Sequence, residues 1–150
     1  MKNNLIKILI KLLFIFMVVF NPPGLKVFSG ETPSVEGTKV YIINIKNGQK
    51  LKSPFLIQFG LTQQMGIAPA MADWPDTGHH HLLINKPKLN HDKPIPKTDN
   101  KKYIHFGKGQ TEGEIALEPG KYTLQAVFAD YSHMTHNPPV VADFIEIIVE

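Results

Sequence analysis

Leu117-Glu118-Pro119-Gly120-Lys121-Tyr122-Thr123-Leu124 is the stretch that decides the fold of this chain. Its centre, Glu118-Pro119-Gly120, has the composition of a tight turn. The residues after the turn alternate in polarity, so that one face of the segment Lys121–Ala129 is apolar. A period of two residues is typical of a strand with one buried face. The stretch therefore predicts a turn that leads directly into a half-buried strand.

Similar short β runs, separated by turn residues, extend in both directions from this turn. We expect seven strands and no helix, at Val40–Ile45, Pro54–Gly60, His79–Asn85, Tyr103–Phe106, Thr111–Leu117, Lys121–Ala129 and Val140–Val149. This pattern predicts an all-β antiparallel sandwich. Tyr122, just inside the sixth strand, indicates an immunoglobulin-like or fibronectin-type sandwich, in which such a tyrosine hydrogen-bonds back across the corner. An ordinary hairpin with a Pro-Gly turn is the alternative.

Residues 1–29 have the organisation of a secretory signal peptide. Three lysines precede an unbroken apolar run from Leu12 to Phe20, and Asn21-Pro22-Pro23 ends that run. A membrane-spanning helix needs about 20 apolar residues, roughly twice the length of this run. We therefore expect cleavage near Ser29–Gly30 and a periplasmic or secreted protein with no stable membrane anchor, an uncleaved anchor being the alternative. Residues 30–39 would form a flexible lead-in, and residues 40–150 the sandwich domain.

The charge of the chain after cleavage excludes nucleic-acid binding. The whole sequence has a formal net charge of +3, but Lys2, Lys7, Lys11 and Lys26 lie in the signal segment. Twelve of the sixteen basic residues and all thirteen acidic residues remain after cleavage, which leaves a net charge of about −1. All the basic residues are lysines, and arginine is the preferred residue for bidentate phosphate recognition. The absence of cysteine excludes disulfides, a lipid anchor and thiolate ligands.

The histidines carry most of the polar chemistry of this sequence. In the immunoglobulin strand order, the connections Leu61–Gly78, Gly107–Gln110 and Asp130–Pro139 share one end of the sandwich. Six of the seven histidines lie in these connections or beside them: His79, His80, His81, His105, His133 and His136. Only His91 falls at the opposite end. The topology therefore predicts a cluster of imidazoles at one pole of the domain.

A cluster of imidazoles with nearby thioethers suits a borderline-soft cation. Copper is favoured, because thioethers prefer Cu(I) and imidazole accepts both oxidation states, and zinc is the alternative. His79 and His81 share one face of a strand, whereas His80 points to the other. The expected ligands are His79, His81, His133 and His136, then His105 and His80, with Met65, Met134 and Asp130 as auxiliary ligands. The role would be metal binding or handover.

Three other interpretations remain open. The histidines could be structural, each bonded to a backbone carbonyl. The same pole could instead bind a cell-envelope protein or a small ligand without any metal. Binding of a protein partner predicts an exposed apolar patch around Trp74. Alternatively, Trp74 would form a lid over the core. Metal-assisted catalysis would need an open coordination position and a base such as Asp130. The sequence indicates neither the oligomeric state nor a substrate.

The order of the motifs resembles that of a bacterial family known as domain of unknown function 4399. The matching stretches are PFLIQFG (54–60), MGIAPA (65–70), GHHHLLI (78–84), PIP (94–96), HFGKGQTE (105–112), PGKYTLQ (119–125) and SHMTHNPP (132–139). They cover nearly the whole domain, in order. The resemblance implies an exported bacterial protein and carries no activity over to this chain.

Overall fold

A computed structural model describes residues 32–62, 64–85, 87, 89–97 and 102–150. The expected signal peptide lies outside these residues. The described residues form ten strands: β1 (Val40–Ile42), β2 (Gln49–Leu51), β3 (Phe55–Leu61), β4 (Gly66–Ile67), β5 (Thr77–Ile84), β6 (Tyr103–His105), β7 (Glu112–Ile115), β8 (Gly120–Ala129), β9 (Thr135–Val141) and β10 (Ile145–Val149). Within these residues there is no helix of any length, hence none that could cross a membrane.

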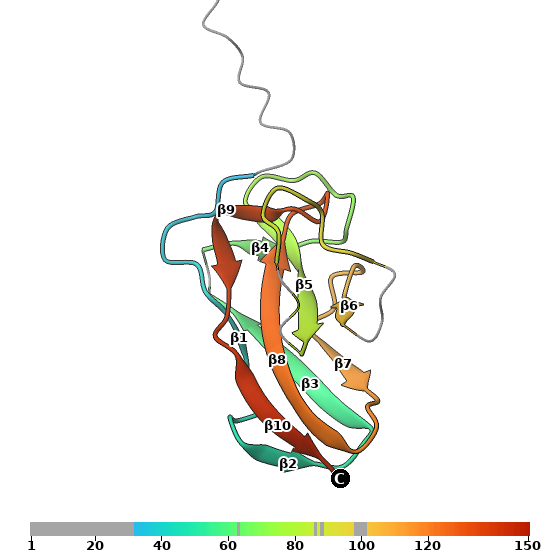
Figure 1. Ribbon diagram of the computed structural model, residues 1–150. Coiled ribbons are helices and arrows are strands. Elements are labelled where there is room, and N and C mark those ends of the chain that lie inside the picture. Colours follow the sequence, from blue (N-terminus) through green and yellow to red (C-terminus); the bar gives the residue numbers. More distant parts are fainter. Residues whose placement is uncertain (1–31, 63, 86, 88, 98–101) are drawn as a thin grey trace, which may run out of the picture.

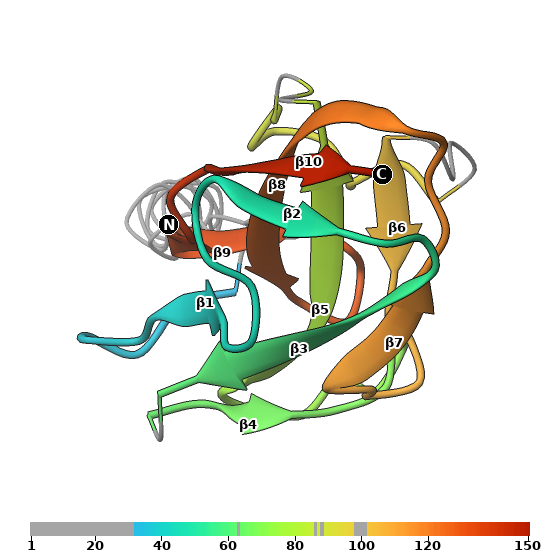
Figure 2. The ribbon, with the colours of Figure 1, turned by 90° about the horizontal axis from the view of Figure 1, so that it is seen from below.

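The strands form two facing sheets, as the sequence predicts (Figures 1 and 2). The smaller sheet has the order β1-β3-β7, which corresponds to the first, second and fifth expected strands. The larger sheet has the order β2-β10-β8-β5-β4, with β6 paired to β5 and β9 paired to β8. The expectation of an all-β, sandwich-like fold is therefore confirmed, with about ten strands in place of seven.

The additional strands are short or arise by division of an expected one. The expected strand Val140–Val149 is divided between β9 and β10, which both pair with β8. β2 and β4 have three and two residues and form parallel pairs with β10 and β5. Elements this short carry no periodicity of their own, because a period of two needs several residues to show.

The residues before the described strands are bonded to the domain. Thr32 and Ser34 exchange backbone hydrogen bonds with Asn137, at 2.9 and 3.0 Å. Thr32 Oγ1 also lies 2.7 Å from Nδ1 of His136. These contacts attach the described part of the expected lead-in to β9.

The expected tyrosine corner is present at the start of β8. The Tyr122 hydroxyl donates a hydrogen bond to the Glu118 carbonyl, at 2.9 Å. This bond closes the Pro119-Gly120 turn between β7 and β8, which belong to different sheets.

The alternation of β5 separates the interior of the sandwich from the outer face of the larger sheet. Leu82 and Ile84 are fully buried in the main core cluster, together with Ile57 and Phe128. Leu83 belongs to a second cluster on the opposite face of the strand. This strand is therefore buried on both faces, because the connection after it covers the outer face, with Ile95 at 2% exposure in the second cluster.

Replacement of the corner tyrosine should destabilise the fold without altering its core. Tyr122→Phe removes one hydrogen bond, and we expect the free energy of unfolding to fall by about 0.5–1.5 kcal/mol. Urea denaturation measures this change. Tyr41→Phe is the control, because the Tyr41 hydroxyl makes no hydrogen bond with the described residues, and it should change stability much less. If the two substitutions lower the free energy of unfolding equally, the Tyr122 hydrogen bond does not stabilise the fold.

Candidate metal centre

Four imidazoles converge on the outer face of the larger sheet. One ring nitrogen from each of His79, His81, His105 and His133 lies within 4.8 Å of the other three. The Nε2 atoms of His79 and His81 are 3.0 Å apart, and so are those of His105 and His133. These residues, which we call the four-histidine group, are the only such metal-compatible group within the described residues.

Strand pairing places three of the four rings. His79 and His81 are two residues apart in β5, so both point away from the sandwich interior. β6 pairs antiparallel with β5, and His105 lies directly opposite His81 in this register. Gly107 leaves room for the His105 ring, because a Cβ at position 107 would collide with that imidazole. The connection from β6 to β7 therefore needs a glycine here.

A tight turn after β8 supplies the fourth ring. His133 has a left-handed backbone conformation, with φ of 73°, which is uncommon for a residue other than glycine. The turn is held by Asp130, whose carboxylate accepts bonds from the Ser132 amide, the Ser132 hydroxyl and the Met134 amide, at 2.8, 2.7 and 3.0 Å. The backbone of Asp130 also bonds with that of His133 and Met134, each at 2.9 Å. Asp130 thus positions His133 through the turn.

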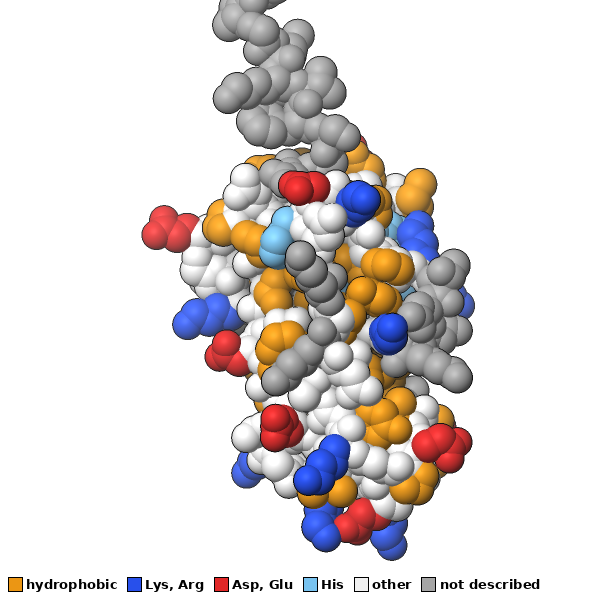
Figure 3. Space-filling model, viewed as in Figure 1, with side chains coloured by type: hydrophobic (Ala, Val, Ile, Leu, Met, Phe, Trp, Pro, Cys, Tyr) orange, Lys and Arg blue, Asp and Glu red, His pale blue; other side chains and the backbone are white. Residues whose placement is uncertain are grey.

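The connection after β5 covers the four-histidine group. The Ile95 amide donates a hydrogen bond of 2.8 Å to the His133 carbonyl, and the Ile95 side chain packs with Leu83 and Val127 beneath the turn. His79 and His81 are fully buried and His133 is 1% exposed. His105 is only partly buried, so it is the solvent-facing member. In Figure 3, histidine surface on the visible face is confined to small areas in the upper half.

Burial keeps these imidazoles neutral. It lowers the pKa of His79 to about 3, with further lowering by the neighbouring His133 and His105. The pKa of His133 falls to about 4, chiefly by burial and then by the positive charge of Lys97. Burial also lowers the pKa of His81, well below its usual value, and that of His105. Neutral imidazole is the form that binds a metal ion.

The other two histidines of the predicted pole lie on the opposite side of the sheet. The His80 ring stacks on Phe59, with 5.0 Å between ring centroids, and meets the edge of Phe128. Its Nδ1 lies 3.3 Å from the Gln110 carbonyl. His136 stacks on Phe128 at 5.7 Å. Both are buried beside the aromatic core and outside the four-histidine group.

The remaining predicted residues have other surroundings. Met65 is buried in the main core cluster. Met134 is 6% exposed and directly follows His133 in the chain. Asp130 is fully buried and lies outside the four-histidine group. His91 bonds with the Thr135 hydroxyl, with 3.0 Å between the ring nitrogen and the oxygen.

The donor set of the four-histidine group suits a transition metal. Zinc and copper bind imidazole nitrogen at about 2.0–2.1 Å, which puts nitrogens around a tetrahedral ion about 3.3 Å apart. The two 3.0 Å separations are already close to this value, and the longest separation of 4.8 Å requires the group to contract around an ion. In the metal-free protein, a neutral imidazole pair can share one N–H between two nitrogens. The arrangement therefore permits both a metal-bound and a metal-free state.

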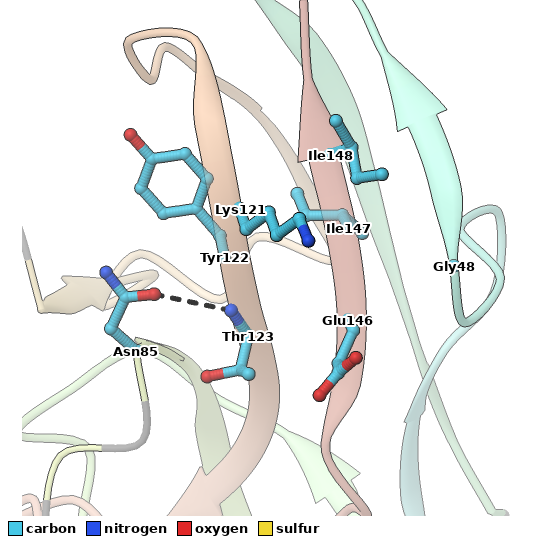
Figure 4. Close-up of a pocket in the computed structure, with 8 residues that line it drawn as sticks. All are labelled: Gly48, Asn85, Lys121, Tyr122, Thr123, Glu146, Ile147 and Ile148. Carbon is cyan, nitrogen blue, oxygen red and sulfur yellow. Dashed lines mark hydrogen bonds between the residues drawn. The ribbon is translucent and has the colours of Figure 1, made fainter.

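A separate hollow lies at the other end of β8, between that strand and β10 (Figure 4). Its lining residues are Gly48, Asn85, Lys121, Tyr122, Thr123, Glu146, Ile147 and Ile148. Asn85 Oδ1 accepts a hydrogen bond from the Thr123 amide at 3.3 Å, which links the end of β5 to β8. None of the four clustered histidines lines this hollow.

The stability of the metal-free protein should fall in acid. The pKa values of His79, His80 and His133 are about 3, about 4 and about 4, all below the unfolded value near 6.5. The unfolded chain therefore binds more protons, and stability that is present above about pH 6.5 is lost as the pH falls toward 4, by up to about 1.4 kcal/mol per pH unit for each imidazole. Denaturation of the metal-free protein across this range measures the loss. A wild-type stability that does not change with pH across this range would contradict burial of these histidines in the neutral form.

Comparison with known proteins supports the resemblance of this chain to one family. No curated protein and no solved structure gives a significant match to this chain. The model of one family, described as a domain of unknown function (DUF4399), matches residues 57–150. This range is more than half of the 150 residues and contains the whole four-histidine group. The chain therefore belongs to the DUF4399 family.

Proposed function

We propose that this domain binds one transition-metal ion through His79, His81, His105 and His133. The observation that carries the proposal is the convergence of four neutral ring nitrogens within 4.8 Å of one another. They come from three separate parts of the chain, namely β5, β6 and the turn after β8. A hydrogen bond between histidines brings only two rings together, whereas a metal ion needs three or four donor atoms around one point.

Copper is the favoured ion, and zinc is the alternative. Imidazole accepts Cu(I), Cu(II) and Zn(II), and at a site made of nitrogen donors Cu(II) binds more tightly than Zn(II). The four-histidine group contains no carboxylate, so it lacks the oxygen ligands that magnesium and calcium require.

Binding or handover of the ion is the role that fits this site. His105 is partly exposed and lies beside the Gly107 turn, so one ligand remains accessible from solvent. The buried Nδ1 atoms of His79, His81 and His133 have no hydrogen-bond partner among the described residues. A histidine that binds a metal through one ring nitrogen usually donates a hydrogen bond from the other. Such hydrogen bonds raise metal affinity roughly 10- to 100-fold. A site without them suits an ion that must be released. An exported protein, periplasmic or secreted, fits this role.

Metal titration tests the proposal directly. We expect protein purified without an affinity tag to bind one equivalent of Cu(II) or Zn(II), with a submicromolar dissociation constant measured by calorimetry. His105→Ala should weaken binding by about tenfold or more, because it removes one ligand with little loss of buried packing. His81→Ala and His133→Ala should abolish one-to-one binding.

Two further histidine variants serve as controls. His91→Ala removes a histidine outside the four-histidine group and should leave the affinity unchanged. His136→Ala removes a buried histidine that stacks on Phe128, so it should lower stability but not stoichiometry. Thermal unfolding of each variant separates loss of fold from loss of a ligand. Affinity no better than that of a disordered histidine peptide, and equal in all variants, would overturn the proposal.

A second candidate function, partner binding, is favoured by one specific observation. Trp74 and Met71 are 61% and 74% exposed, in the connection between β4 and β5. Trp74 thus lies on the surface rather than over the core. The Met71 amide donates a hydrogen bond to the Tyr131 carbonyl, in the turn that carries His133. Trp74 and Met71 are three residues apart in this connection, and a contiguous exposed apolar patch is typical of a protein–protein contact.

Site-specific photo-cross-linking tests this second candidate. Trp74→p-benzoylphenylalanine should yield one discrete cross-linked species in cells that export the protein. Ile43→p-benzoylphenylalanine is the matched control, because Ile43 is similarly exposed, at 58%, but lies just after β1. Identical patterns from the two positions would argue against a specific contact at Trp74.

A further inference from the structure

The Asp130 carboxylate contacts two distant parts of the chain. Its Oδ1 atom accepts the three hydrogen bonds that hold the turn of His133. Its Oδ2 atom accepts a hydrogen bond of 3.5 Å from the Thr32 hydroxyl, its only partner among the described residues. Asp130 is fully buried, and burying a carboxylate is costly unless its oxygens are hydrogen-bonded. Thr32 therefore completes the surroundings of the residue that positions His133.

The backbone of β9 and the ring of His136 hold Thr32 in place. The Asn137 amide donates a hydrogen bond to the Thr32 carbonyl at 2.9 Å, and the Ser34 amide donates one to the Asn137 carbonyl at 3.0 Å. The Ser34 hydroxyl donates to the Pro138 carbonyl at 2.8 Å. Nδ1 of His136 lies 2.7 Å from Oγ1 of Thr32. The Thr32 hydroxyl is thus fixed between His136 and the Asp130 carboxylate.

The donors and acceptors of this chain of bonds follow from the chemistry of its members. A carboxylate only accepts and a hydroxyl has one proton, so the Thr32 hydroxyl donates to Asp130. The Thr32 oxygen in turn accepts the proton of Nδ1 of His136. Nε2 of His136 is buried without a partner among the described residues. It is then an unpaired acceptor, and buried unpaired N–H groups are rarer. One hydroxyl therefore makes both bonds.

Residues 32–38, which we call the N-terminal strap, run from β9 to β1 (Figure 1). Pro33 forms a parallel bridge with β9. Val35 packs against the main core cluster. The Thr38 hydroxyl donates a hydrogen bond of 2.6 Å to the Val35 carbonyl, which closes a turn before β1. The strap therefore joins the edge of the larger sheet to the edge of the smaller one.

We propose that docking of the N-terminal strap controls the metal affinity of the four-histidine group, with Thr32 as the positioning residue. The inference rests on the proposed metal site. Thr32 acts through the Asp130 carboxylate, which holds the turn that carries His133. Without the Thr32 hydroxyl, Oδ2 of Asp130 is left buried and unpaired, so the turn opens more often and His133 is held less firmly. Because coupling between sites is reciprocal, a bound metal ion should also strengthen docking of the strap.

Hydrogen exchange of the metal-free full chain tests the coupling between strap and turn. Thr32→Val replaces the hydroxyl by a methyl group. The amides of Ser132 and Met134, which bond to Asp130, should then exchange about fivefold faster or more. Thr38→Val is the matched control, because it removes a hydroxyl that bonds within the strap and not to Asp130. Equal exchange of the two amides in both variants would overturn the proposal.

Calorimetric titration with Cu(II) tests the effect on the centre. Thr32→Val should weaken binding about fivefold or more. Thr32→Ser, which retains the hydroxyl, should bind like the wild type, and so should Thr38→Val. If the wild type itself fails to bind copper, the proposed function is overturned and this inference with it. If the wild type binds and Thr32→Val binds equally well, the inference alone is overturned.

The reciprocal effect is measured on the wild type without any substitution. Loading with Zn(II) should slow the exchange of the Ser34 amide, which docks the strap on β9. The same exchange rate in the metal-free and the zinc-loaded protein would show that strap and centre are not coupled.

Discussion

The alternation of side chains along β5 is the constraint on which the rest of this structure depends. Three consecutive histidines in a strand cannot share a face, so the middle one enters the sandwich and the outer two leave it. His80 meets the aromatic core at Phe59 and Phe128. His79 and His81 face outward, where a bare sheet would expose them to solvent. Every other feature of the site follows from how this outer face is covered.

Two further segments extend the pair of histidines to a group of four, of which His105 is only partly buried. β6 brings His105 opposite His81, and the turn organised by Asp130 brings His133 over both. Ile95 joins that turn to the connection after β5 through a backbone bond and an apolar contact. β6, this turn and the connection after β5 therefore cover His79 and His81, and burial lowers the pKa of all four imidazoles. The geometry and the protonation state of the site therefore have one common origin.

Local patterns in the sequence predict the fold well and the site only in part. The alternation of β8, the Tyr122 corner and the outward pair His79 and His81 are all properties of a few neighbouring residues. His105 joins the site because of the β5–β6 register, which depends on the connection between them. The sequence predicts that His133 and His136 are both ligands, but His133, which has a left-handed backbone, joins the four-histidine group, while His136 packs on Phe128. Register and backbone handedness are set by tertiary contacts, and a single sequence does not display them.

The burial of these imidazoles has a cost that bears on the proposed metal binding. The Nδ1 atoms of His79, His81 and His133 are buried without a partner among the described residues. A buried polar group left in that state costs about 1–3 kcal/mol, so apolar side chains at these positions would give a more stable domain. Because these histidines are buried in the neutral form, the domain loses further stability in acid. A metal ion that binds only the folded chain would offset these costs, since its binding free energy adds directly to folding stability. The buried histidines should thus lower the stability of the metal-free domain, and the proposed metal binding would offset that loss.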